Sequence, residues 1–218
     1  MTTATVHPPP PVVGIVDDDR DTRASLRLLL EAAGYAVDTW PDADACLAAL
    51  QPEQAGCLLL DVRMPGMGGL QAQSRLPEHG IEIPVIIITG HGDVPMAVAA
   101  MKAGAVDFIE KPFNDQLLLD CVQAALARDR QRRAALARRE TVHARYTSLT
   151  PREREVMREV VRGHANKDIA ETLNVSRKTV EVHRAKVMDK MQAESLSQLI
   201  QMAMSLGELG EFEESTQP

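Results

Sequence analysis

The first half of the chain alternates short apolar runs with longer segments whose apolar positions recur every three or four residues. This alternation predicts β-strands separated by α-helices, because side chains on one face repeat every two residues in a strand and every 3.6 in a helix. Strands are expected at residues 12–16, 36–40, 57–60, 85–89 and 106–109, and helices at about 20–33, 42–50, 68–76, 94–103 and after Asn114.

The apolar runs at 58–60 and 85–88 are not interrupted by polar residues. Strands of this kind are covered on both faces, as in a parallel sheet with helices on each side. Five strand–helix units therefore predict a five-stranded, doubly wound α/β fold of the flavodoxin type. In such a fold the active crevice lies at the carboxyl ends of the strands.

Strand patterns vanish after residue 146, and helix-start signals replace them. Residues 150–153, Thr-Pro-Arg-Glu, combine a capping box with a proline at the first helical position. Further helix starts are predicted at Asn166, Ser176 and Ser195, with Gln198 at the reciprocal capping position of the last. The second half is therefore expected to form a compact all-α domain of four helices.

The segment from Asn166 to Ala185 has the periodicity of two short helices around a tight turn. Asn174 lies at the turn, where asparagine tolerates the left-handed backbone conformation, and Ala170 is small at the helix crossing. The apolar residues of the expected shared core are Ile169, Leu173, Val175, Val180 and Val187. This arrangement predicts a helix-turn-helix, and a small helical bundle with solvated basic faces is the alternative.

The second helix of this motif would place its amino end in the major groove of DNA. The basic residues that could contact phosphates are Arg177, Lys178, Arg184, Lys186 and Lys190. The residues placed to meet base edges are Thr179, Glu181, Val182 and Ala185. His183 is expected to pack or to contact a phosphate, since no second His or Cys stands at metal-ligand spacing.

Charge is distributed unevenly along the chain. Residues 1–125 carry 7 basic and 17 acidic side chains, a net charge of −10, whereas residues 126–148 carry +5 and residues 149–205 carry +2. The overall charge of −7 therefore conceals a basic hinge and a mildly basic second half. The expected division is a disordered lead-in at 1–11, an α/β domain at 12–126, a helical linker at 127–146, a helical domain at 147–206 and an acidic tail at 207–218.

An apolar fraction of 44% with 25% charged residues is typical of a globular protein. No stretch approaches the roughly 18 consecutive apolar residues of a membrane span, and the N-terminus lacks the apolar core of a signal peptide. The three cysteines, Cys46, Cys57 and Cys121, are odd in number and have no metal-ligand spacing. These features predict a cytoplasmic protein with reduced thiols and no membrane partner.

Polar side chains stand at the carboxyl ends of four predicted strands: Asp17, Asp18 and Asp19 after the first, Asp61 after the third, Thr89 ending the fourth and Lys111 after the fifth. In a parallel sheet these positions face one edge, where the pKa of one of the clustered carboxylates should rise unless a cation such as Mg²⁺ or Mn²⁺ intervenes. A carboxylate, a divalent metal, a hydroxyl and an ammonium supply what phosphoryl transfer needs. Taken singly, each has a structural explanation, namely an N-cap, a strand end or a turn.

Four segments resemble the signature set of two-component receiver domains: Val16-Asp17-Asp18, DVRMPGMGG at 61–69, TGHGD at 89–93 and EKPF at 110–113. The run from 89 to 113 is especially similar to the FixJ group, which includes styrene- and toluene-type regulators. The resemblance implies phosphorylation of Asp61, a metal held by Asp18, Asp61 and the backbone carbonyl of Arg63, and Asp17 acting through water. It also implies that Lys111 pairs with a phosphoryl oxygen and that Thr89 donates its hydroxyl. Asp19 leaves a one-residue shift of the Asp17/Asp18 register open.

Gly68 stands where the family often has serine, a difference expected to affect a turn rather than the chemistry. Phe108 stands where the family places a switch aromatic that fills the space behind Thr89 after phosphorylation; a plain core phenylalanine is the alternative. The fourth predicted helix and the fifth strand would then form a symmetric dimer on phosphorylation. The residues of this surface are Met96, Val98, Met101, Lys102 and Ala105.

Residues 149–153 and 179–184 resemble the LuxR-type four-helix output domain, over residues 147–205. The two resemblances imply a response regulator that accepts a phosphoryl group from a sensor histidine kinase, binds promoter DNA and regulates transcription by RNA polymerase, usually as an activator. Its self-limited phosphorylation chemistry would not make it an enzyme. The alternatives are a phosphatase of similar sheet architecture, disfavoured by the helix-turn-helix, and a constitutive DNA binder whose receiver serves only protein contacts.

Overall fold

The computed structural model describes residues 10–90 and 92–207, and the chain divides into two compact units between Arg132 and Arg133. The first unit contains two apolar cores and the second contains one. Most of the predicted lead-in and of the predicted acidic tail lies outside the described residues, so these two assignments stay predictions.

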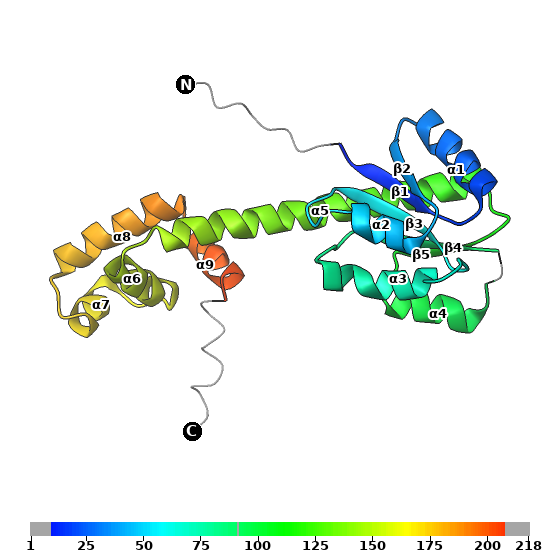
Figure 1. Ribbon diagram of the computed structural model, residues 1–218. Helices are drawn as coiled ribbons and strands as arrows, with labels where there is room; N and C mark the ends of the chain where they lie inside the picture. Colours follow the sequence, from blue (N-terminus) through cyan, green and yellow to red (C-terminus); the bar gives the residue numbers. More distant parts are fainter. Residues whose placement is uncertain (1–9, 91, 208–218) are drawn as a thin grey trace. The chain divides into compact units, whose positions relative to one another are not determined.

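The first unit is built on a five-stranded parallel sheet with the order β2-β1-β3-β4-β5 (Figure 1). Its strands are β1 (Val12–Val16), β2 (Ala36–Trp40), β3 (Gly56–Asp61), β4 (Val85–Thr89) and β5 (Asp107–Glu110). This confirms the doubly wound α/β fold. β3 is one residue longer at each end than predicted, since Gly56 pairs with Val12 and Asp61 with Ile88. β5 begins and ends one residue later than predicted, and Glu110 pairs with Thr89.

The helices of this unit are α1 (Arg20–Ala32), α2 (Ala43–Ala49), α3 (Gly69–Arg75), the 3-10 helix η1 (Leu76–His79), α4 (Val94–Lys102) and the first part of α5 (Asp115–Thr147). α1 and α5 cover one face of the sheet, and α2, α3 and α4 cover the other (Figure 1). Alternate residues of β3 serve the two cores, since Leu59 belongs to the first and Leu60 to the second. This double covering explains the uninterrupted apolar runs in the sequence.

The start of α3 lies close against the end of β3. A Cβ atom at Gly69 would lie 2.1 Å from the carbonyl oxygen of Asp61, so this approach requires glycine. The Gly69 N–H donates to the carbonyl oxygen of Val62 at 3.0 Å, which fixes the helix start. Gly68 is the N-cap of α3 and offers no side-chain acceptor, so the position where the family often has serine lies at the turn into α3.

The first unit continues past the boundary predicted at residue 126. Asp129 of α5 is buried, and its carboxylate accepts the N–H of Gly56 at 3.1 Å and pairs with Arg132 at 3.0 Å. Arg132 also pairs with Glu82 at 2.8 Å. These contacts attach α5 to the start of β3, so the unit ends at Arg132. The arginine-rich sequence indicated an exposed linker here. Local sequence could not show otherwise, because Gly56 and Glu82, the partners of Asp129 and Arg132, lie 73 and 50 residues earlier in the chain.

The second unit contains the end of α5 together with α6 (Pro151–Val161), α7 (Asn166–Thr172), α8 (Arg177–Met191) and α9 (Leu196–Ser205). Its core includes Val156, Met157, Ile169, Val180, Val187 and Leu199. Val142 and Tyr146 of α5 pack against this core. The predicted four-helix domain is therefore confirmed, and the last turns of α5 are part of it.

Side-chain caps begin three of these helices as predicted. The capping box between Thr150 and Glu153 is complete at α6, and Ser176 and Ser195 cap α8 and α9. Asn174, between α7 and α8, has the expected left-handed conformation with φ 52°. The helix-turn-helix geometry is thus set by local residues.

Two predicted caps differ in detail. Asn166 is the first helical residue of α7, and the N-cap is Ala165, which makes no side-chain cap hydrogen bond. The Asn166 side chain accepts a hydrogen bond from Arg184. Gln198 accepts the N–H of Glu194 rather than that of Ser195. The backbone of Ser195 is extended (φ −149°, ψ 159°), and the N–H of Glu194 points toward Gln198 in the first turn of α9.

Candidate functional site

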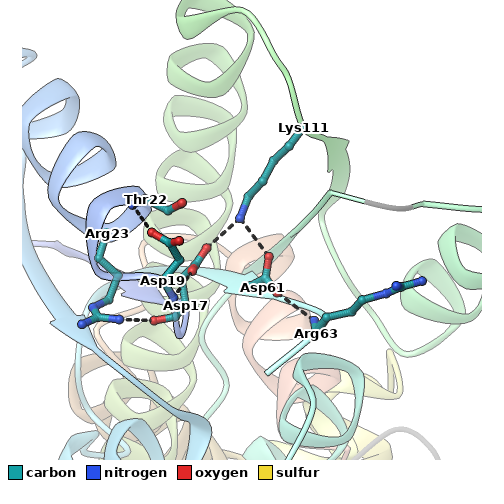
Figure 2. A network of polar contacts seen from close by, with 7 residues as sticks. All are labelled: Asp17, Asp19, Thr22, Arg23, Asp61, Arg63 and Lys111. Atoms are coloured by element: carbon teal, nitrogen blue, oxygen red, sulfur yellow. Dashed lines mark hydrogen bonds and ion pairs between the residues drawn. The ribbon is translucent and has the colours of Figure 1, made fainter. Parts of the chain in front are cut away.

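The carboxyl ends of β1 and β3 and the residue after β5 bring three charged side chains together (Figure 2). The Nζ atom of Lys111 lies 2.7 Å from Oδ2 of Asp17 and 2.9 Å from Oδ1 of Asp61. Both carboxylates are buried, with exposures of 3% and 8%. Burial lowers the pKa of Lys111, but the hydrogen bonds to Asp17 and Asp61 more than offset it, so the pKa is raised and the group stays an ammonium. One cation therefore bridges two carboxylates that would otherwise repel each other.

Backbone groups hold the other carboxylate oxygens in place. Oδ2 of Asp61 accepts the N–H of Arg63 at 2.7 Å, and Oδ1 of Asp17 accepts the N–H of Asp19 at 2.8 Å (Figure 2). Arg23 of α1 donates to the carbonyl oxygen of Asp17 at 2.6 Å. Arg23 was not among the site residues predicted from the sequence. The available signal was its position in the first turns of α1, six residues after Asp17.

The three aspartates after β1 have different environments. Asp17 points into the pocket, and Asp18 is exposed. Asp19 is the N-cap of α1 and accepts the N–H of Thr22 at 2.7 Å, which lowers the pKa of Asp19. Asp19 therefore serves the start of α1, and the Asp17/Asp18 register of the metal ligands stays a prediction.

The expected metal site has a simple donor set. Among residues 10–90 and 92–207, no three His, Cys, Asp or Glu side chains form a group that could hold a metal ion. Mg²⁺ does not require such a group, because it keeps several waters and takes only one or two carboxylates. The implied donors, the carboxylates of Asp18 and Asp61 and the carbonyl of Arg63, are hard oxygens and fit Mg²⁺ or Mn²⁺.

Thr89 and Phe108 lie near the loop that follows β4. Thr89 is fully buried, and Phe108 is half-buried and packs against the core under α2, α3 and α4. A Cβ atom at Gly92 would lie 2.9 Å from Cε1 of Phe108 and 3.3 Å from Cγ2 of Thr89. Phe108 is therefore a core residue that also faces the loop after Thr89.

The surface predicted for dimerisation is exposed over most of its residues. Met101 and Val98 are 48% and 46% exposed, Lys102 is exposed, and Met96 is half-buried. Ala105 is 5% exposed and belongs to the core. Its assignment to the surface was wrong, because the chain turns inward there from α4 to β5.

The residues predicted to face DNA lie on α8, whose opposite side buries Val180 and Val187. The exposed members are Lys178, Glu181, Val182, Ala185 and Lys186, and the half-buried members are Thr179 and Arg184. Oγ1 of Thr179 lies 2.8 Å from Oγ of Ser176, so this hydroxyl is part of the helix start.

Two basic residues of α8 have partners inside the second unit. Nη1 of Arg184 donates to Oδ1 of Asn166 at 3.0 Å and links α8 to α7. Nζ of Lys190 lies 2.6 Å from Oε2 of Glu153, a buried carboxylate of α6. This hydrogen bond is the main cause that lowers the pKa of Glu153 from 4.5 to about 2. Lys190 therefore links α8 to α6, and its expected contact with a phosphate stays a prediction.

Two family models match the chain, one on each unit. The response regulator receiver domain matches residues 13–123, and the bacterial regulatory proteins of the luxR family match residues 147–203. The chain belongs to the response regulators. It is a two-component response regulator with a LuxR-type DNA-binding domain, and it regulates transcription.

The similarity between this response regulator and its relatives extends over both units. FixJ from Bradyrhizobium diazoefficiens is 45% identical over 197 residues, which cover 90% of this chain and 96% of FixJ. TodT from Pseudomonas putida is 43% identical over 195 residues, covering 89% of this chain and 86% of TodT. The solved structure of the response regulator StyR is 43% identical, covers 90% of this chain and 99% of that chain, and has a TM-score of 0.82. The predicted resemblance to the FixJ group is confirmed.

A receiver joined to a DNA-binding domain implies a sensor kinase and DNA as the partners of this regulator. In the described part of the chain, no helix combines the length and the apolar character needed to span a bilayer. Cys46, Cys57 and Cys121 are free and buried, and burial raises the pKa of each thiol to about 12. These thiols stay protonated near neutral pH.

Proposed function

We propose that Asp61 accepts a phosphoryl group from the phosphohistidine of a sensor histidine kinase, and that this modification controls DNA binding by the second unit. The observation that carries the proposal is the anchoring of the Asp61 carboxylate. One oxygen accepts the N–H of Arg63 and the other accepts a hydrogen bond from the Lys111 ammonium. A carboxylate fixed beside a cation is suited to attack on phosphorus whose oxygens are anionic.

Each residue of the pocket has its own role in the proposed phosphoryl transfer. Asp61 supplies the nucleophilic oxygen and keeps the phosphoryl group as an acyl phosphate. Lys111 offers N–H donors to one phosphoryl oxygen, and Thr89 offers its hydroxyl to another. Mg²⁺ or Mn²⁺ bound by Asp18, Asp61 and Arg63 would neutralise charge on the transferred group. The transfer is stoichiometric, so the chain is a phosphoacceptor with self-limited dephosphorylation and not a multiple-turnover enzyme.

A groove of about 780 Å³ borders the pocket at Lys111. One wall is formed by α1, where Leu28 is 70% exposed, and the other by Pro112 and Phe113. The groove combines these apolar side chains with charged ones such as Asp19, Asp21 and Lys111. Because it opens beside the pocket, it supports docking of the kinase here, with its phosphohistidine directed at Asp61.

Phosphorylation adds a charge of about −1.5 to −2 and three acceptor oxygens. In this proposal Thr89 moves toward these oxygens, and Phe108 fills the space behind it. The surface of α4 and β5, with Met96, Met101 and Lys102, then forms a symmetric dimer. Two second units are thereby held on a two-fold operator in the cytoplasm, where the regulator activates RNA polymerase.

The amino end of α8 is the element proposed to enter the major groove. Lys178 and Lys186, both exposed, are suited to phosphates, and Val182, 48% exposed, is suited to a base edge. Arg184 already donates to Asn166, so it would hold α7 and α8 together as one surface that faces the DNA.

Treatment of the purified chain with acetyl phosphate and Mg²⁺ tests the phosphoacceptor. Intact-mass spectrometry should find one phosphoryl adduct that hydroxylamine removes, because acyl phosphates react with this nucleophile. Asp61→Asn should carry no adduct, and the matched control Asp44→Asn, which changes an exposed aspartate of α2, should be modified like the wild type. A wild-type chain without any adduct would contradict the proposal.

A constitutive DNA binder is the second candidate, because the second unit has its own core and exposes its DNA-facing residues by itself. The intact arrangement of Asp17, Asp61 and Lys111 favours the regulated alternative. Binding to the operator at one stated salt concentration, with and without acetyl phosphate, separates them. Equal binding by the wild type and by Asp61→Asn under all these conditions would favour the constitutive binder.

A further inference from the structure

Within the second unit, the distal part of α5 and helix α9 enclose a groove of about 660 Å³. Val142 and Met202, which pack against the core, form an apolar floor, and Arg138 and Arg139 stand on the α5 side. A second groove of about 470 Å³ shares Arg139 with the first and is lined by Leu136, His143 and Leu206 among others. Neither groove is lined by a residue of α8.

Two arginines beside these grooves have no partner among the residues that the structure describes. Arg138 and Arg139 are exposed, and within residues 10–90 and 92–207 neither has an ion pair or a side-chain hydrogen bond. Residues 133–148 contain four arginines and one acidic residue, Glu140, which lines the smaller groove. An apolar floor beside unpaired arginines is complementary to an acidic segment that also carries apolar side chains.

The same chain contains such a segment, and it begins beside the grooves. Leu206 lines the smaller groove, and only Gly207 separates it from residues 208–218. Those eleven residues, ELGEFEESTQP, hold four glutamates and no basic residue, with Leu209 and Phe212 three positions apart. Their extended length reaches at most about 36–40 Å.

We propose that the acidic segment at 208–218 docks in these grooves of its own chain. Leu209 and Phe212 would contact the apolar floor, and the glutamates would pair with Arg138 and Arg139. Because the segment is tethered, its effective concentration is on the order of millimolar, so modest contacts are sufficient. The docked segment covers the α9 face and neutralises arginines of α5, and it thereby competes with a second copy of the chain for that face. This inference is independent of phosphorylation at Asp61.

Backbone NMR relaxation on the full-length, unphosphorylated chain tests the docking. We expect order parameters for residues 208–214 above about 0.6 in the wild type, and well below that value in the double variant Arg138→Gln/Arg139→Gln. The matched control Arg128→Gln/Arg130→Gln removes the same charge from exposed positions of α5 in the first unit and should leave the segment ordered. Phe212→Ala, which leaves every described residue unchanged, should release the segment as well.

Three results would overturn the proposal. The first is a segment with order parameters below about 0.6 in the wild type. The second is an ordered segment that neither Arg138→Gln/Arg139→Gln nor Phe212→Ala releases. The third is ordering that disappears on dilution together with a dimer, because a second copy of the chain would then be the occupant of the grooves.

Discussion

Lysines from distant parts of the chain neutralise buried carboxylates in both units. Lys111 reaches Asp17 and Asp61 across the edge of the sheet, and Lys190 reaches Glu153 between α8 and α6. The carboxylates of the first set end strands at an open edge, whereas Glu153 is enclosed in a helix cap. The same residue pairing therefore lies at the proposed phosphorylation site in one unit and forms a structural contact in the other.

Replacing Lys111 by alanine should slow modification of Asp61 by acetyl phosphate about 10²-fold, because a fixed positive charge near the transferred oxygens is lost. Arg75→Ala removes an exposed cation of α3 and should leave the rate close to that of the wild type. The rate is measured by intact mass at several times under one ionic strength. Equal rates in Lys111→Ala and the wild type would show that the ammonium serves only to hold the Asp17 and Asp61 carboxylates together.

Glu153 gives the second unit an acid-sensitive stability. Its pKa is lowered from 4.5 to about 2, so its contribution is complete above pH 4.5 and is lost as the pH falls from 4.5 towards 2. Glu153→Gln should lower the free energy of unfolding at pH 7 by about 1–2 kcal/mol and flatten its pH dependence in that window. Urea titrations of a fragment comprising residues 133–218, followed by circular dichroism, measure both effects.

The comparison variant for Glu153 is Glu155→Gln, which breaks a partly exposed pair with Arg152. Its effect should stay below about 0.5 kcal/mol, because exposed ion pairs contribute little. A pH profile of Glu153→Gln that parallels the wild type would rule out the Lys190 pairing as the source of acid sensitivity.

At the scale of elements, the sequence was most informative where local residues decide the structure. The strands at 12–16, 36–40 and 85–89 follow apolar runs, and the starts of α6, α8 and α9 follow local caps. The same strand ends correctly indicated that Asp17, Asp61 and Lys111 converge. Local signals could not show that Asp129 is buried under Gly56 or that Lys190 pairs with Glu153, because those partners are 73 and 37 residues away.

The junction of β3 and α3 depends on the absence of a side chain at Gly69. Gly69→Ala should destabilise the first unit by about 1–3 kcal/mol, because the new Cβ would press on the carbonyl of Asp61 and the backbone would have to move. Gly69→Ala should also slow phosphorylation of Asp61, because it displaces the backbone of Asp61. Thermal unfolding followed by the fluorescence of Trp40 measures the first effect.

Gly90→Ala is the matched change, since a Cβ at Gly90 meets nothing within 4 Å and this glycine follows another strand of the same edge. Its unfolding midpoint should stay near that of the wild type. If both variants unfolded at the same temperature, the close approach of α3 would be unimportant for stability.

At the scale of the whole molecule, α5 belongs to both units. Its first part contributes Leu118 and Val122 to the core of the receiver, and its last part packs Val142 and Tyr146 on the output domain. Arg145 also donates to the carbonyl of Met191 at 3.2 Å. The composition of residues 127–146 indicated a linker, but the ends of this segment are integral to the two folds.

A fragment of residues 147–218 should therefore be less stable than a fragment of residues 133–218. The shorter one lacks Val142, Tyr146 and the Arg145 hydrogen bond, and we expect a loss of about 2–4 kcal/mol from the lost apolar contacts. Urea unfolding of both fragments gives the difference. A fragment of residues 140–218 retains all three residues and should match the longer one; equal stability of all three fragments would show that the end of α5 is dispensable.

The hydrogen bond between Gly56 and Asp129 makes one amide proton a natural reporter. Gly56 begins the strand that ends at Asp61, and Asp129 lies on the helix that continues into the output domain. An amide held by a buried carboxylate exchanges with deuterium only when the two elements separate. The exchange rate of this single proton thus measures how often α5 separates from the sheet in the native chain. If phosphorylation by the kinase changes that frequency, the exchange rate changes with it.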